Sequence, residues 1–162
     1  MPKVIVVYDS VKGSTEKLAH TIAEGLKQVD GLEVSVKKVD DVKCNDLIEY
    51  DGIALGSPTY FGLMSNKIKK LVDETYDIRG KLVGKVGLPF VTFGAVASGS
   101  DTALLSLVCA MLANGMIVQG DNKMWHFGIA VQRTMPSESL EYAKERGRLF
   151  GELVKKLFSQ GK

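Results

Sequence analysis

The residues best suited to ligand chemistry near the start of the chain form a short polar segment between an apolar run and a helical pattern. The segment carries three hydroxyls and a glycine, in the order Ser10, Val11, Lys12, Gly13, Ser14 and Thr15. Successive N–H groups at a helix N-terminus bind phosphate, and the helix dipole reinforces the interaction. The segment therefore predicts a phosphate cradle, and the alternative is that Ser14 only caps the helix. It matches neither a Walker A loop nor a Gly-x-Gly-x-x-Gly turn, which argues against a Rossmann dinucleotide site.

A second segment places two aromatic side chains among residues that favour turns. It follows the apolar run at 52–56 and contains Pro58, Thr59, Tyr60, Phe61 and Gly62. Aromatic side chains in a loop at a strand end are unfavourable on a surface unless a planar group packs on them. We expect Tyr60 and Phe61 to provide such a surface. The alternative is that both side chains fold back into the protein's own core.

A third segment, after the apolar run at 86–93, consists of small side chains. It contains Ala95, Val96, Ala97, Ser98 and Gly99, so a ligand edge can approach its backbone N–H and C=O groups closely. The alternative for the end of this segment is that Ser100 or Asp101 only caps the next helix. A phosphate cradle, an aromatic surface and a small-residue wall together fit a phosphorylated planar ring system better than a sugar or a metal ion.

Apolar runs alternate with helical patterns along the chain and indicate how these segments are positioned. Strands are expected at 3–8, 32–39, 52–56 and 86–93, and a fifth strand in two pieces at 116–118 and 127–131. Pro89 is awkward inside the fourth strand because proline donates no ladder hydrogen bond. The last helix opens with Pro136, Ser137 and Glu138, of which Ser137 is placed to cap the N-terminus, and it runs to about Phe158.

Alternating strands and helices predict an α/β domain with parallel strands, right-handed crossovers and helices on both faces of the sheet. No linker, repeat or low-complexity tract divides the sequence, so we expect residues 1–162 to form a single three-layer domain. In a doubly wound sheet, ligands bind beyond the carboxyl ends of the strands. The three segments described above all follow predicted strands.

Composition excludes several classes of function. The 162 residues include 21 Lys and Arg against 19 Asp and Glu, a net charge of +2 that does not indicate nucleic-acid binding. No apolar stretch is long enough to cross a membrane, and the N-terminus does not resemble a signal peptide. Cys44 and Cys109 have no metal-site spacing and fit a reducing cytoplasm, so no metal ligand is assigned.

The three segments, in this order, resemble the flavodoxin-like FMN proteins over nearly the whole chain. Residues 10–15 resemble their phosphate loop, and residues 56–62 are similar to the Gly-Thr/Ser-Pro-Thr-x-Phe-Gly loop of the WrbA-type quinone reductases. Residues 92–94 and 114–117 also resemble that branch, although Lys12 and Asn114 replace an aromatic residue and a histidine. The resemblance implies a flavodoxin-like doubly wound fold with a five-stranded parallel sheet in the order 2-1-3-4-5, and one non-covalent FMN.

By the same resemblance, residues 10–15 hold the FMN phosphate, residues 58–62 and 95–99 flank the isoalloxazine ring, and the backbone of Gly62 approaches flavin N5. The flavin then carries the redox chemistry and no side chain is assigned a catalytic role. We expect an electron carrier that works between redox partner proteins. The alternative is an NAD(P)H-dependent quinone or flavin reductase, with NAD(P)H and quinone as its partners. Whether the chain forms a homo-oligomer is left open.

Overall fold

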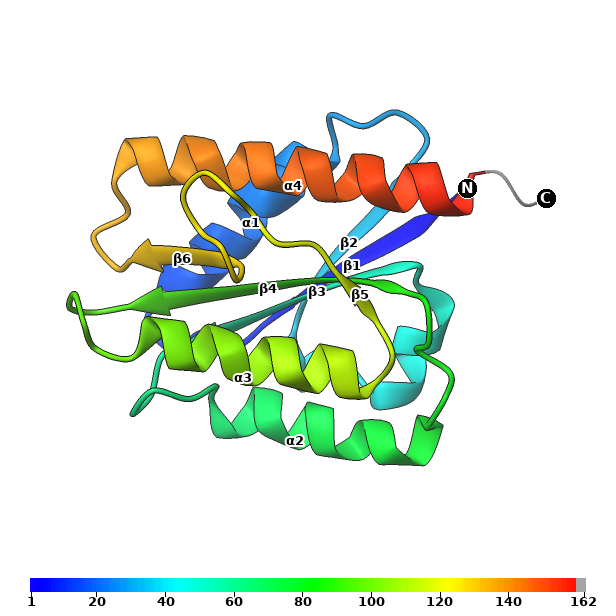
Figure 1. The fold of residues 1–162 in the computed structure, drawn as a ribbon, viewed down its shortest axis with the longest axis horizontal. Coiled ribbons are helices and arrows are strands. Elements are labelled where there is room, and N and C mark those ends of the chain that lie inside the picture. Colours follow the sequence, from blue (N-terminus) through cyan, green and yellow to red (C-terminus); the bar gives the residue numbers. More distant parts are fainter. Residues whose placement is uncertain (160–162) are drawn as a thin grey trace.

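A twisted parallel β-sheet forms the centre of the computed structural model, which describes residues 1–159 (Figure 1). The strands are β1 (Lys3–Tyr8), β2 (Glu33–Lys38), β3 (Gly52–Pro58), β4 (Val86–Phe93), β5 (Ile117–Val118) and β6 (Ile129–Gln132). Their order is β2-β1-β3-β4-β5, and β6 also pairs with β4. Because β5 and β6 share the position of the fifth strand, the expected order 2-1-3-4-5 is confirmed.

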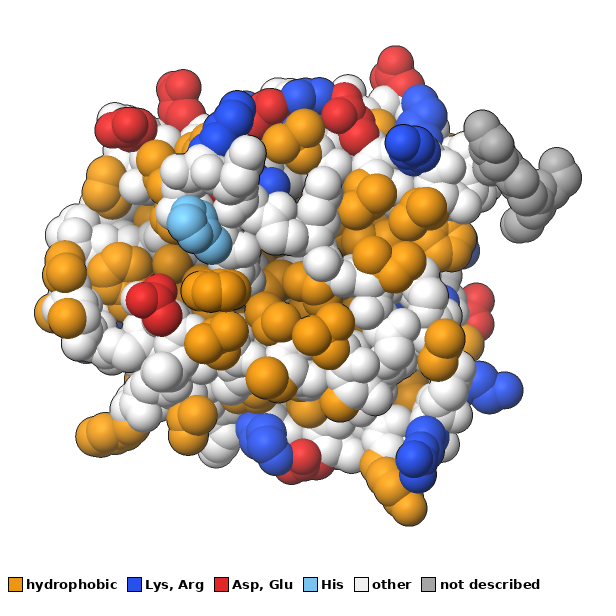
Figure 2. Space-filling view, viewed as in Figure 1, with side chains coloured by type: hydrophobic (Ala, Val, Ile, Leu, Met, Phe, Trp, Pro, Cys, Tyr) orange, Lys and Arg blue, Asp and Glu red, His pale blue; other side chains and the backbone are white. Residues whose placement is uncertain are grey.

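Helices cover both faces of this sheet. They are α1 (Ser14–Leu26), α2 (Asn66–Glu74), α3 (Ser100–Ala113) and α4 (Ser137–Phe158), with short 3-10 turns η1 (Val39–Asp41), η2 (Cys44–Glu49) and η3 (Thr75–Ile78). Helices α1 and α4 lie on one face, and α2 and α3 lie on the other (Figure 1). Acidic and basic side chains lie along the top of the view in Figure 2, where Figure 1 shows α4. On that helix, Arg148 pairs with Glu145 and Glu152.

The apolar run of β1 shows why the strand is buried on both sides. Side chains alternate across a strand, so Val4 and Val6 pack beneath α1 and α4, whereas Ile5 and Val7 pack toward α2 and α3. All four are fully buried. A strand that contributes to two cores needs an uninterrupted apolar sequence, which is what the pattern predicted.

Pro89 lies where the fifth strand is interrupted. β5 pairs with Val86 and Gly87, and β6 pairs with Phe90–Phe93, so neither piece is in register with Pro89. The odd-numbered residues of β4 direct their backbone groups to this side, since the Phe93 carbonyl accepts from the Arg133 N–H at 2.8 Å. The N–H that proline lacks therefore has no ladder partner to lose, and the segment between β5 and β6 leaves the sheet as a loop.

Asp121 organises the loop between β5 and β6. Its carboxylate accepts hydrogen bonds from the backbone N–H groups of Lys123, Met124 and Trp125 at 3.1–3.4 Å and from the Tyr142 hydroxyl at 2.7 Å. Burial alone would raise the pKa of Asp121, but these hydrogen bonds outweigh it and lower the pKa to about 2. The Trp125 ring lies 5.2 Å from that of Tyr142, so Trp125 anchors the loop to α4.

Replacing Asp121 with asparagine is expected to lower the free energy of unfolding by about 2 kcal/mol at pH 7, from a pKa lowered from 3.8 to about 2. The carboxylate's stabilisation is fully present above its unfolded pKa and disappears as the pH falls toward 2. Urea unfolding between pH 7 and pH 2 measures the free energies of unfolding of wild type and Asp121→Asn, which should converge as the pH falls. Asp77→Asn, at an exposed aspartate, is the control, and a difference that stayed constant with pH would contradict the assignment.

None of the helices among residues 1–159 is both long enough and apolar enough to span a membrane.

Candidate functional site

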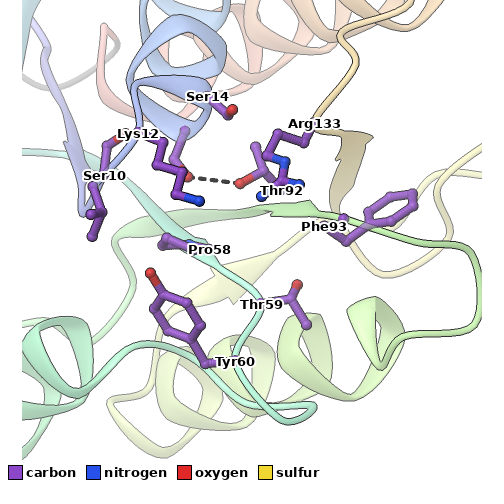
Figure 3. A pocket seen from close by; sticks show the side chains of 12 residues that line it. Ser10, Lys12, Ser14, Pro58, Thr59, Tyr60, Thr92, Phe93 and Arg133 are labelled. Carbon is purple, nitrogen blue, oxygen red and sulfur yellow. Dashed lines mark hydrogen bonds between the residues drawn. The ribbon is translucent and has the colours of Figure 1, made fainter.

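A cavity of about 180 Å³ opens at the edge of the sheet where β1, β3 and β4 end (Figure 3). It is lined by Ser10, Val11, Lys12, Ser14, Thr15, Pro58, Thr59, Tyr60, Thr92, Phe93, Gly94 and Arg133. The structure therefore brings the first and second predicted segments together. This is the edge at which the rule for doubly wound sheets places a ligand.

The phosphate segment has the geometry of an anion cradle. Gly13 adopts a left-handed conformation (φ +90°) and is the N-cap of α1, so Ser14 is not the capping residue. The Gly13 N–H donates to Ser10 Oγ at 3.1 Å, which closes the turn. The first helical hydrogen bond is donated by Lys17, so the preceding N–H groups at the start of α1 have no partner within the helix. These groups and the Ser14 hydroxyl are available to an anion.

Three threonines, Thr15, Thr59 and Thr92, line the cavity. Thr15 Oγ1 and Thr92 Oγ1 share a hydrogen bond of 2.8 Å, drawn as a dashed line in Figure 3, and both residues are buried. Thr59 Oγ1 is also buried and has no hydrogen-bond partner among the described residues. A buried hydroxyl without a partner is costly, and a polar ligand in the cavity would satisfy it.

The two aromatic residues of the second segment lie in a tight turn. Tyr60 and Leu63 exchange backbone hydrogen bonds at 2.9 and 3.0 Å, with Phe61 (φ +49°) and Gly62 (φ +76°) between them. The Tyr60 side chain lines the cavity, whereas Phe61 is fully exposed at the tip of the turn. Neither side chain folds back into the core. A bulky residue at positive φ is strained, and such strain occurs preferentially at functional sites.

The small-residue segment lies beside this turn but does not line the cavity. Residues 95–98 are exposed, and Gly99 (φ +92°) is the N-cap of α3, so neither Ser100 nor Asp101 caps that helix. A Cβ on Gly99 would lie 2.6 Å from the Cα of Gly62, which shows how closely the two segments approach. The absence of a side chain at Gly99 therefore leaves room for the protein's own backbone at Gly62.

Four cavity residues were absent from the predicted set. Thr92, Phe93 and Gly94 come from the end of β4, and Arg133 directly follows β6. The Phe93 ring points away from the other labelled side chains in Figure 3. The signal that could have identified Arg133 was its position just after a strand, at the edge where strand ends converge.

Comparison with known proteins agrees with this architecture. Residues 5–97 match the flavodoxin domain family. A flavodoxin of Aquifex aeolicus (strain VF5) is 35% identical over 162 residues, covering 95% of this chain and 88% of that protein. An NAD(P)H dehydrogenase (quinone) of Archaeoglobus fulgidus is 29% identical over 191 residues, covering 97% of this chain and all of that protein.

The fold recurs in solved structures. The crystal structure of the flavodoxin, WrbA-like protein from Agrobacterium tumefaciens superposes with a TM-score of 0.82 at 22% identity, covering 96% of this chain and 99% of the other. At that identity the likeness concerns the fold alone, whereas the family match and the Aquifex relative concern the sequence. The chain therefore belongs to the flavodoxin family of FMN-binding redox proteins.

Proposed function

We propose that this protein holds a non-covalent FMN at the cavity and carries electrons between redox partner proteins. The observation that carries the proposal is the cavity itself, which lies at the N-terminus of α1 and is lined by the hydroxyl-bearing residues Ser14, Thr15 and Thr59. Such a donor set suits a phosphorylated, hydroxyl-bearing ligand tail. The cytoplasm is the compartment we propose, because Cys44 and Cys109 are both free thiols.

The residues present fit the cofactor. A volume of about 180 Å³ is below the roughly 300–1,000 Å³ of pockets that enclose a whole ligand. We therefore assign the cavity to the phosphate and the ribityl chain. The ring system is assigned to the rim, between the Tyr60–Leu63 turn and residues 95–99. The unpartnered Thr59 hydroxyl supports a polar chain in the cavity rather than an apolar one.

The protein's contribution to the chemistry is binding, orientation and control of access. Bound FMN supplies the one- and two-electron redox chemistry. Gly13 lets the backbone turn around the phosphate, while the α1 N–H groups and the Ser14 hydroxyl donate to it. The Thr15–Thr92 hydrogen bond joins two residues of the cavity lining, and the Tyr60 ring restricts water at one side of the cavity. The turn that holds Gly62 places backbone groups at the rim, where they influence the redox potential of the ring.

The carrier function is supported by the relatives. The flavodoxins of Aquifex aeolicus (strain VF5) and Clostridium saccharobutylicum are 35% and 34% identical, each over at least 94% of this chain. The sequence also lacks a dedicated nicotinamide motif. Both points favour exchange of electrons with partner proteins over direct use of NAD(P)H.

A quinone reductase is the second candidate function. It is favoured by the Archaeoglobus relative named NAD(P)H dehydrogenase (quinone) and by the exposed small side chains of residues 95–98, which carry no aromatic ring to cover a flavin. In that case nicotinamide and quinone would have to use the open flavin face in turn.

Anaerobic stopped-flow mixing of the FMN-loaded protein with NADH or NADPH separates the two functions. A carrier is expected to show no reduction on the timescale of seconds and no turnover when a quinone is added, while dithionite still reduces the flavin fully. Rapid bleaching by either nucleotide, followed by quinone-dependent turnover, would instead establish the reductase and overturn the carrier.

Replacing Gly62 with alanine is expected to change the redox potentials of bound FMN more than its affinity. The new Cβ would lie 2.7 Å from Thr102 Oγ1, and the φ of +76° disfavours any side chain, so the turn or the Thr102 side chain has to adjust. Potentiometric titration gives the potentials, and fluorescence titration gives the affinity. Leu63→Ala, in the same turn, is the control, and unchanged potentials in Gly62→Ala would contradict a backbone role at the ring.

A further inference from the structure

The charged side chains that line the cavity are both cationic. Lys12 and Arg133 enter from opposite sides, and Figure 3 shows both pointing toward the space beside the Thr15–Thr92 hydrogen bond. No carboxylate lines the cavity, and neither cation forms a salt bridge within residues 1–159. Elsewhere in the described chain, eight lysines and arginines are paired with carboxylates.

The backbone holds Arg133 at the sheet edge. Its N–H donates to the Phe93 carbonyl at 2.8 Å, continuing the ladder one residue beyond β6. The side-chain amide of the preceding Gln132 donates to the Gly94 carbonyl at 3.2 Å. The chain then turns away, because the Met135 N–H donates to the Gln132 carbonyl at 2.8 Å. The base of the arginine side chain is therefore fixed although the side chain itself is exposed.

Two unpaired cations beside a cradle of neutral donors favour the binding of an anion between them. Each repels the other while the space between them holds no anion, and a phosphate dianion would pair with both. The planar guanidinium can donate two parallel hydrogen bonds to phosphate oxygens, which a lysine cannot. The cradle supplies donors of no formal charge, so Lys12 and Arg133 are the charged side chains of the cavity lining with which a phosphate can pair.

We propose that Lys12 and Arg133 add to the specificity of this site for the phosphorylated flavin, by pairing with its phosphate from two sides. The proposal rests on the proposed function, since it takes FMN as the ligand. It adds a residue outside the three motifs, Arg133, and gives a role to Lys12, where the resemblance leads one to expect an aromatic residue.

The test is equilibrium titration of flavin-free, full-length protein with FMN and with riboflavin at low and high salt. Arg133→Gln is expected to weaken FMN binding about tenfold, a loss typical of a charge-assisted pair with phosphate, while riboflavin binding stays within about twofold. Lys12→Gln is expected to weaken FMN binding by a smaller factor. Arg133→Lys is expected to recover part of the FMN affinity that Arg133→Gln loses. Both neutral variants should also show a shallower dependence of the FMN dissociation constant on salt, and weaker competition by inorganic phosphate.

Lys17→Gln is the matched control, because Lys17 is exposed on the first turn of α1 and does not line the cavity. It removes one positive charge near the cradle and is expected to change FMN affinity by less than about twofold. Equal losses in Lys17→Gln and Arg133→Gln would show a general field and overturn the specific pairing. FMN binding unchanged in Arg133→Gln and Lys12→Gln would also overturn it. Failure of the wild-type protein to bind FMN would instead refute the proposed function.

Discussion

Replacing Ser14 and Thr15 together with alanine is expected to weaken FMN binding by about a hundredfold, because each hydroxyl bonded to a charged phosphate contributes about 1.5 kcal/mol or more. Riboflavin has no phosphate, so its affinity should change by less than about threefold. Ser14 is free to donate because Gly13 occupies the N-cap of α1. Titration of flavin-free protein with both ligands, followed by fluorescence, measures the two effects side by side.

The controls separate loss of a ligand contact from loss of structure. Thr15 is 1% exposed and bonded to Thr92, so removing its hydroxyl leaves Thr92 Oγ1 without a partner. Thr15→Ser keeps the hydroxyl and should restore most of the FMN affinity. Thr21→Ala, in the same helix and away from the cavity, should bind FMN like wild type. Equal losses of FMN and riboflavin in the double variant would contradict the phosphate assignment.

Replacing Gly147 with alanine is expected to lower the free energy of unfolding by about 3 kcal/mol, the upper part of the range for overpacking. Helices α1 and α4 touch here through their backbones, and a Cβ on Gly147 would lie 2.2 Å from the Ile22 carbonyl oxygen. Alanine favours a helix over glycine by about 1 kcal/mol, but the helices would have to separate to relieve this contact. The steric term therefore outweighs the gain in helix propensity.

Chemical denaturation of wild type and Gly147→Ala measures this loss, and FMN affinity reports whether α1 still presents its N-terminus. Gly25→Ala should behave alike, because its Cβ would lie 1.9 Å from the Lys144 carbonyl oxygen. Gly94→Ala is the control for stability, since nothing lies within 4 Å of the Cβ it would add. A stability of Gly147→Ala equal to or above that of wild type would show that α1 and α4 do not pack as closely as described.

β1 and β4 were predictable because a strand that is buried on both faces has a continuous apolar sequence. β1 and β4 have the bounds expected from their apolar runs, and both pieces of the fifth strand pair with β4. Helix starts were less predictable. α1, α3 and α4 each begin with a serine, but the residue before it is the N-cap and no side-chain cap forms, so the expected capping by Ser137 is wrong.

The candidate site was predictable in its parts more than in their arrangement. Small side chains at 95–99 indicated a close approach, but such residues admit a ligand and a neighbouring backbone equally well, and here Gly99 meets Gly62. An aromatic residue in a strand-end loop indicated a contact surface, yet only the turn geometry shows that Tyr60 faces the cavity while Phe61 faces solvent. Arg133 was missed because the short β6 gave little reason to examine the residue after it.

The most direct test of the central claim is a crystal structure of this protein grown with FMN. We expect the phosphate within about 3.2 Å of donors in the segment from Ser10 to Thr15, the usual limit for such hydrogen bonds. We also expect the ring system at the rim, next to Tyr60 and residues 95–99. A phosphate bound elsewhere, or a cavity filled by the protein's own Tyr60 or Phe61 in the presence of excess FMN, would contradict the central claim.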